Sequence, residues 1–277
     1  MDAFSTAIVL LAGALAIVIP IALIYFYARK HSLSLKIALY GAGFFLLVQF
    51  FHTPLVILTQ SSVYLSFIKA VGNTGAIILI AVYLGALAAL FEEISRYLIF
   101  KKFLKQKTLE GAKLFGLGWG GVEAVLLMGL LGTVSVFVTE DFFNKTDFST
   151  LNQTLLAQGT PPQIVEMQVD FLLQQKAAFE KRSPFEPLLG FYERLLAIAF
   201  HVCASILVMQ SVLSNSRRGL YAALGWHFLL DAVLVFLAYS LGTGSALLVE
   251  GALTLIVVAF VFFTARELKA PLAKVFA

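Results

Sequence analysis

Charged residues are scarce in this chain. Asp, Glu, Lys and Arg make up 13% of its 277 residues, whereas 60% of the residues are hydrophobic. A soluble domain of this length carries roughly a quarter charged residues. The composition therefore excludes an ordinary soluble domain and predicts a protein that crosses a cell membrane several times.

Cysteine is almost absent, since Cys203 is the only one. A single cysteine excludes an internal disulfide and a zinc site built from several cysteines. The formal net charge of +4 is no evidence for nucleic acid binding, because the basic residues gather in short connections and act there as topology signals. We therefore expect the lipid bilayer, and no nucleic acid, as a partner.

The first apolar segment lacks the basic residues that open a cleavable signal peptide, so we expect it to remain as a membrane helix. We predict an all-α polytopic membrane bundle of about seven transmembrane helices, which forms one domain over residues 1–277. The apolar stretches of spanning length fall near 3–28, 33–59, 72–100, 112–138, 187–213, 219–241 and 243–265.

Basic residues alternate along the connections between these stretches. The odd-numbered connections are rich in Lys and Arg, whereas the second has only Lys69. The basic residues of the odd connections are Arg29, Lys30 and Lys36, then Lys101, Lys102, Lys105, Lys107 and Lys113, then Arg217 and Arg218. Because Lys and Arg accumulate on the cytoplasmic side, we predict that the N-terminus lies outside and the C-terminus inside.

The fourth connection, about 140–186, is the only sizeable aqueous segment that the sequence predicts. Apolar residues recur there at helical spacing after Pro161 and Pro162, and proline is favoured at the start of a helix. We expect an amphipathic helix on the extracytoplasmic face.

Ionisable side chains interrupt four consecutive apolar stretches. Such residues are costly inside a membrane and indicate a functional site. They are Glu92, Glu93 and Arg96 in the third stretch, Glu123 in the fourth, His201 in the fifth, and His227 and Asp231 in the sixth. Counted at 1.5 Å per residue, the positions roughly 12–18 Å from the cytoplasmic ends of their helices are Glu92, Glu123, His201, His227 and Asp231. The sequence therefore predicts one polar layer built by four helices.

The spacing within the third stretch suggests a division of roles. Glu92 and Arg96 are four residues apart and Glu93 and Arg96 are three apart, so either carboxylate can pair with the guanidinium. Two adjacent carboxylates in a poorly solvated site titrate apart, which yields one base and one acid. The spacing does not decide which glutamate is the base.

Neighbouring residues suggest how the other groups are held. His227 and Asp231 lie on one helix face, so the carboxylate can fix the tautomer of the imidazole. Glu123 has no cation within a turn of its own helix and follows four closely spaced glycines. Because glycines let helices approach closely, we expect Glu123 to face the bundle.

The order of these motifs resembles the CAAX-protease and bacteriocin-processing superfamily of intramembrane proteases, and within it the YhfC-like family of membrane peptidases. The resemblance rests on EExxR at Glu92, Glu93 and Arg96, a following Glu123, then His201, then HxxxD at His227 and Asp231. It covers about residues 72–241. Prenyl-protein proteases instead show EExxxR and a His at the second motif, so the resemblance gives no support for a prenylated substrate.

The resemblance implies an intramembrane endopeptidase of a prokaryotic plasma membrane, with a membrane-embedded or membrane-associated peptide or protein as substrate. In this interpretation Glu92 or Glu93 activates a water molecule, and Glu123, His201, His227 and Asp231 complete the site with Arg96. If Zn²⁺ is bound, Glu123, His201 and His227 are the expected ligands, since two His and one Glu with an open position form a common catalytic zinc site. A reaction through the glutamate alone, without metal, remains open.

Two other functions stay open from the sequence. The chain also resembles the Aph subunit of γ-secretase, which implies a non-catalytic scaffold or substrate-binding subunit. A proton-coupled transporter is a third reading, because Glu and His relays occur in transporters. The transporter reading lacks support from pseudo-symmetric halves or broken helices.

Overall fold

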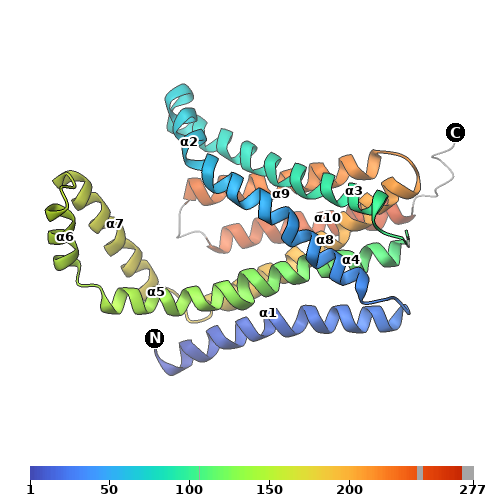
Figure 1. Ribbon diagram of the computed structural model, residues 1–277, viewed down its shortest axis with the longest axis horizontal. Coiled ribbons are helices and arrows are strands. Elements are labelled where there is room, and N and C mark those ends of the chain that lie inside the picture. Colours follow the sequence, from blue (N-terminus) through green and yellow to red (C-terminus); the bar gives the residue numbers. More distant parts are fainter. Residues whose placement is uncertain (106, 242–245, 270–277) are drawn as a thin grey trace.

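The computed structural model describes residues 1–105, 107–241 and 246–269, and within these ranges every regular element is a helix (Figure 1). This confirms the all-α architecture. The α-helices are α1 (Ala3–Lys30), α2 (Lys36–Ala89), α3 (Ser95–Lys102), α4 (Leu109–Ala124), α5 (Thr133–Lys145), α6 (Phe148–Ala157), α7 (Pro162–Lys181), α8 (Glu186–Leu213), α9 (Arg218–Leu241) and α10 (Ala246–Lys269). Two π-helical segments, η1 (Leu90–Ile94) and η2 (Val125–Gly132), continue α2 and α4.

In the described part of the chain, six helices are long and apolar enough to cross a membrane. The longest, Lys36–Lys102, has 67 residues and reverses direction at Gly72, where φ is 76° and ψ is 176°. Glycine adopts this conformation without the steric cost that a side chain would bring. Two of the seven predicted helices, near 33–59 and 72–100, are therefore the two arms of one helical hairpin.

Side-chain contacts join the two arms of this hairpin. Thr59 Oγ1 lies 2.7 Å from the Tyr83 hydroxyl, and nearer the open end Gln49 Nε2 donates to Glu92 Oε1 at 3.0 Å. The farther a pair lies from Gly72, the larger the sequence separation between its two residues. The two arms are therefore antiparallel. This arrangement carries Glu92 and Glu93 back into the bundle.

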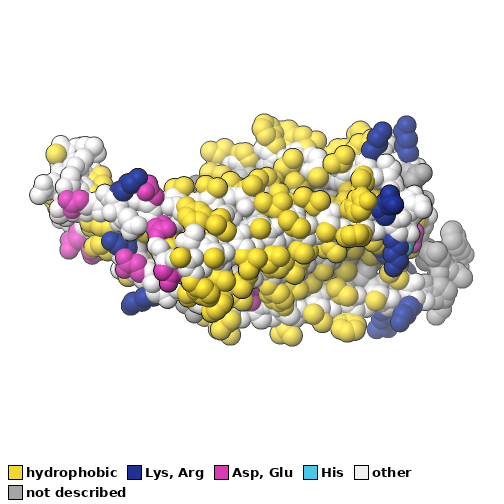
Figure 2. Space-filling model, turned by 90° about the horizontal axis from the view of Figure 1, so that it is seen from below, with side chains coloured by type: hydrophobic (Ala, Val, Ile, Leu, Met, Phe, Trp, Pro, Cys, Tyr) yellow, Lys and Arg dark blue, Asp and Glu magenta, His cyan; other side chains and the backbone are white. Residues whose placement is uncertain are grey.

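The outer surface of the bundle is apolar. Side chains such as Leu58, Leu255 and Phe262 are more than 70% exposed, which would be costly in water and is favourable against lipid tails. Figure 2 shows hydrophobic side chains over the middle of one face, with Lys and Arg prevailing at the right end and mixed with Asp and Glu at the left end. The connections after α1 and α3 lie at the right end in Figure 1. The chain is thus a multi-pass membrane protein.

Helix α4 lies between neighbours on two sides because its glycines admit close approach. A Cβ on Gly116 would lie 2.7 Å from the His201 carbonyl oxygen, and a Cβ on Gly120 would lie 2.8 Å from Ile198 Cα. Gly118 meets the backbone of Ala38 in the same way on the α2 side. The backbones of α2, α4 and α8 therefore touch at the level of the predicted polar layer.

Aromatic rings fill the core next to this contact. Trp119, Phe100, Phe115, Phe200 and Phe260 are at most 1% exposed. Phe100 and Phe115 pack edge to face with centroids 4.8 Å apart, and Phe200 and Phe260 are 4.9 Å apart. These rings leave little room for side chains to change rotamer, which fixes the polar groups beside them.

Helices α6 and α7 form the inserted segment and extend away from the bundle (Figure 1). The Asp147 side chain caps α6, and hydrogen bonds from Thr150 and Ser149 lower its pKa to about 2. Helix α7 begins at Pro162, as predicted, and buries Val165 and Val169. A polar helix pair thus stands at the end of the bundle opposite the basic connections.

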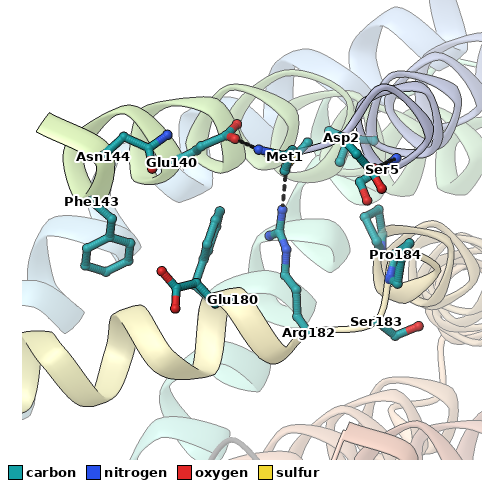
Figure 3. Close-up of a pocket in the computed structure, with 13 residues that line it drawn as sticks. Met1, Asp2, Ser5, Glu140, Phe143, Asn144, Glu180, Arg182, Ser183 and Pro184 are labelled. Atoms are coloured by element: carbon teal, nitrogen blue, oxygen red, sulfur yellow. Dashed lines mark hydrogen bonds and ion pairs between the residues drawn. The ribbon is translucent and has the colours of Figure 1, made fainter.

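A pocket of about 290 Å³ marks the junction of this insertion with the bundle (Figure 3). The amino group of Met1 pairs with Glu140 of α5. The Arg182 guanidinium lies 4.0 Å from the centre of the Phe179 ring and donates to the Met1 sulfur at 3.1 Å. These contacts tie the start of α1 and the end of α7 to α5.

Candidate functional site

All seven ionisable residues that the sequence singled out lie in contact with one another inside the bundle. We call this set the polar network. It comprises Glu92 and Glu93 of η1, Arg96 of α3, Glu123 of α4, His201 of α8, and His227 and Asp231 of α9. Elements far apart in sequence therefore bring their polar groups to one level.

Arg96 lies at the centre of the polar network. Its side chain is 0% exposed and forms an ion pair with Glu93, which is also 0% exposed. Its Nη2 lies 3.1 Å from His201 Nδ1, and the guanidinium packs on Trp119 with its carbon 4.6 Å from the ring centre. The guanidinium thus joins the carboxylate of one helix to the imidazole of another.

The tautomer of His201 follows from these contacts. A guanidinium only donates hydrogen bonds, so Nδ1 of His201 accepts from Arg96 and carries no proton. The other nitrogen, Nε2, lies 2.7 Å from Glu123 Oε2 and donates to it. His201 is therefore a neutral imidazole held between a cation and a carboxylate.

His227 has a different environment, with a carboxylate at each nitrogen. Nδ1 lies 2.7 Å from Glu93 Oε1, and Nε2 lies 3.4 Å from Asp231 Oδ2. Ionised carboxylates only accept hydrogen bonds, so both contacts are satisfied together when the ring carries two protons. The ring centres of the two histidines are 6.0 Å apart. His201 lies between a cation and a carboxylate, whereas His227 lies between two carboxylates.

The two adjacent glutamates also have different partners. Glu93 is bonded to Arg96 and His227, as described above. Glu92 accepts from two neutral donors, Gln49 Nε2 at 3.0 Å and Trp119 Nε1 at 3.1 Å, and its nearest contact with Arg96 is 4.0 Å. Glu93 therefore forms an ion pair, whereas the hydrogen-bond donors to Glu92 are neutral.

Both glutamates lie in the π-helical turn η1, and a second π-helical segment, η2, begins two residues after Glu123. A π-helical turn is wider than an α-helical one and frequently marks a functional site. In η1 it presents Glu92 toward α2 and α4 while Glu93 meets α9. The sequence pattern gave no sign of either segment.

Glu123 has a cation partner that the sequence did not indicate. Arg194 of α8 donates from Nη1 to Glu123 Oε1 at 2.6 Å and also pairs with Glu193. From the sequence, Glu123 had no cation within a turn of its own helix. The partner comes from the neighbouring helix, because an α4–α8 contact brings residues 71 positions apart into reach.

Sequence reasoning thus missed three residues of the site, namely Gln49, Trp119 and Arg194. Gln49 interrupts the apolar run LLVQFF, and Trp119 sits among the glycines before Glu123. An inventory of uncharged polar groups within the spans would have included Gln49 and the indole N–H of Trp119. No comparable signal links Arg194 to Glu123.

The predicted zinc ligands do not converge in this arrangement. Among the residues that the structure describes, no three His, Cys, Asp or Glu side chains are placed to hold one metal ion. Glu123 and His201 are bonded to each other, but Arg96 lies between His201 and the Glu93–His227 pair. The donor types suit zinc, whereas their placement does not. The ligand set Glu123, His201 and His227 stays a prediction.

Negative side chains outnumber positive ones in the polar network. Within the network, the four carboxylates of Glu92, Glu93, Glu123 and Asp231 outnumber the one guanidinium of Arg96, and the Arg194 guanidinium is shared between Glu123 and Glu193. The carboxylates thus exceed the guanidinium groups, and a poorly solvated site disfavours such an excess of negative charge. A cluster of carboxylates and imidazoles inside an apolar bundle is typical of a site for acid and base chemistry.

Comparison with known proteins identifies one matching family and one similar bacterial protein. Residues 15–262 match the family model described as YhfC intramembrane metalloprotease. The chain is 31% identical over 217 residues to "Uncharacterized membrane protein YhfC" of Bacillus subtilis (strain 168), and the alignment covers 76% of each protein. No solved structure matches the chain significantly.

Proposed function

Since the chain belongs to the YhfC intramembrane metalloprotease family, we propose that it is an intramembrane endopeptidase. Its substrate would be a membrane-embedded or membrane-associated peptide or protein. The observation that carries the proposal is the polar network, in which seven ionisable side chains from separate helices contact one another inside an apolar bundle. Ionisable groups at such depth are costly and are typical of functional sites.

We propose Glu92 as the general base. Its side chain is 8% exposed, whereas that of Glu93 is 0% exposed, so Glu92 is the one that water can reach. Gln49 and Trp119 hold its two oxygens without neutralising the charge. Glu93 would orient Arg96 and His227.

Hydrolysis would then proceed in two steps. Glu92 takes a proton from a water molecule as the water oxygen attacks the carbonyl carbon of the substrate. Arg96, whose Nε has no hydrogen-bond partner among the described residues, would stabilise the negative oxygen that forms. The carbon–nitrogen bond breaks, and the proton passes to the leaving amine through Glu92 or His227. One water is consumed and the two products are an acid and an amine.

The orientation in the membrane belongs to the same proposal. The basic connections gather at one end of the molecule (Figure 2), and the positive-inside rule puts that end in the cytoplasm. The N-terminus and the α6–α7 insertion would then lie outside, and the core of helices over about 72–241 would admit substrate from the cytoplasmic half of the bilayer.

The test is a comparison of new protein termini in membranes from cells that express the wild type or Glu92→Gln. We expect internal cleavage sites in membrane proteins that occur with the wild type and fall at least 100-fold with Glu92→Gln, since a general base contributes about 10²–10⁴-fold. Glu110→Gln is the matched control, because Glu110 is an exposed carboxylate of α4 outside the network. Identical termini in all three membranes would overturn the peptidase and favour a scaffold.

A further inference from the structure

Two adjoining cavities lie on the membrane-facing side of α1 and α2, away from the polar network. The larger, of about 460 Å³, is formed by the end of α1 and the connection to α2. The other, of about 380 Å³, runs along α1, α2 and α4. Tyr25 and Leu35 line both of them. The two cavities therefore adjoin at these two side chains, and together we call them the groove.

The cavity along the helices is apolar throughout. Ile21 and Ile24 of α1 form one wall, and Leu39 of α2 belongs to the other. Gly118 and Gly121 of α4 form the floor. A Cβ on Gly118 would collide with the Ala38 carbonyl group, so α4 packs directly against α2 at this floor.

The depth of this floor is sensitive to side-chain size. A Cβ on Gly121 would approach Ile24 Cδ1 and Pro20 Cβ to 3.3 Å. The groove thus has the shape and surface that suit a hydrocarbon chain, and it contains no residue of the polar network.

The cavity at the mouth is basic and polar. Arg29 and Ser32 line it, and the Arg29 guanidinium lies over the Tyr25 ring, 5.9 Å from its centre. Lys30 and Lys36 flank it in sequence, and residues 28–38 include no Asp or Glu. A cationic opening above an apolar slot matches a molecule with an anionic head and a hydrocarbon tail.

We propose that this groove binds one anionic phospholipid. The phosphate would lie beside Arg29 and the Ser32 hydroxyl, and one acyl chain would lie over Gly118 and Gly121. Basic pockets between membrane helices are known to select anionic head groups. Van der Waals contacts between the acyl chain and the apolar cavity would add to the binding free energy. The site is separate from the polar network, so its occupancy does not depend on peptidase activity.

Native mass spectrometry of the detergent-purified protein tests this site. The probes are phosphatidylglycerol, phosphatidylcholine with the same acyl chains, and inorganic phosphate. We expect one phosphatidylglycerol per chain, bound at least tenfold more tightly than phosphatidylcholine, and no binding of phosphate alone. Equal binding of the two lipids would overturn the proposal in favour of unselective surface lipid, and phosphate binding alone would overturn the need for a lipid.

Variants locate the binding within the groove. Arg29→Gln should weaken phosphatidylglycerol binding about fivefold, which is the contribution expected of one basic residue near the membrane surface. Ala42→Phe, on the α2 wall, should fill the slot and weaken both lipids. Arg266→Gln is the control, because Arg266 is an exposed basic residue of α10 outside both cavities. If Arg266→Gln and Arg29→Gln weaken binding equally, the proposed site is wrong.

Discussion

At the scale of single residues, the site is decided by which partner each charge finds. Glu92 and Glu93 are adjacent and chemically identical, yet one is held by neutral donors and the other by a cation. The spacing allowed Arg96 to pair with either glutamate. The structure pairs it with Glu93, because the guanidinium also reaches His201 from that side.

This pairing predicts that Glu93→Gln and Glu92→Gln differ in stability as well as activity. Glu93→Gln leaves the buried Arg96 guanidinium without its carboxylate, which costs about 3–5 kcal/mol for buried ion pairs. Glu92→Gln keeps an amide oxygen that accepts from Trp119 and should change stability by less than about 1.5 kcal/mol. Thermal unfolding of both variants in detergent measures the difference. Equal loss of stability in the two would contradict the assignment of Arg96 to Glu93.

Zinc content is a second prediction at the residue scale. If the predicted ligands rearrange to bind metal, Arg96 must leave the space between His201 and Glu93. Elemental mass spectrometry of the purified wild type should then give about one zinc per chain. His201→Ala and His227→Ala should each lose it, and Cys203→Ala, which changes a buried residue outside the network, should keep it.

An absence of zinc in the wild type purified without chelators would overturn the predicted ligand set. The proposed role of Glu92 would remain testable by the cleavage comparison, since Glu92 is not one of the predicted zinc ligands. Zinc that persists in both histidine variants would place the metal at other residues.

At the scale of elements, the glycines of α4 determine how closely the helices that carry the network approach. Gly116 and Gly120 meet α8 and Gly118 meets α2. The contact between Glu123 and His201 depends on this approach, because both side chains are too short to meet across a wider gap. The π-helical turn η1, which continues α2, also determines contacts of the network, because it presents two neighbouring glutamates to different helices.

We predict that Gly120→Ala disrupts the site. The added Cβ would lie 2.8 Å from Ile198 Cα, which is backbone and cannot rotate away, so α4 and α8 must separate. The expected cost is about 1–3 kcal/mol of stability, as for other overpacked interiors, together with loss of cleavage. Thermal unfolding and the cleavage comparison measure both effects.

Gly43→Ala is the matched control for this prediction. It places the same methyl group on a helix glycine that has no atom within 4 Å of the added Cβ. Because alanine favours helix more than glycine does, it should stabilise the protein slightly or leave it unchanged. If both variants behave alike, the close approach of α4 and α8 does not explain the effect.

At the scale of the whole molecule, the separation of charge between its ends predicts the orientation. Basic connections lie at one end and the α6–α7 insertion at the other (Figures 1 and 2). Ser34 lies in the α1–α2 connection and Ser149 at the start of α6, and both are exposed. The buried Cys203 can be replaced to give a background without cysteine.

A membrane-impermeant maleimide applied to intact cells should then label Ser149→Cys and spare Ser34→Cys. Permeabilised cells should show labelling of both, which controls for accessibility of the thiol. Labelling of Ser34→Cys alone in intact cells would reverse the proposed orientation. It would also move the site from the cytoplasmic to the outer half of the membrane.

Taken alone, the sequence predicted the all-α membrane bundle, the helical insertion that begins at Pro162, and the family. The bundle and the insertion were predictable because membrane spans are encoded locally: apolar length, helix punctuation and the sign of nearby charge each lie within a short segment. The family came from the resemblance of the motif order. The seven ionisable residues were found in the same way, since an ionisable group in an apolar run is conspicuous without knowledge of its neighbours.

The partners of those residues were decided by the tertiary structure alone. Gln49 and Trp119 on Glu92, Arg194 on Glu123, and Arg96 between Glu93 and His201 come from contacts between helices. No short segment of the sequence specifies which helix faces meet. The rotation of each helix about its axis depends on glycine contacts and on π-helical turns that involve the whole bundle. The same contacts hold the predicted zinc ligands apart, which periodicity and depth could not reveal.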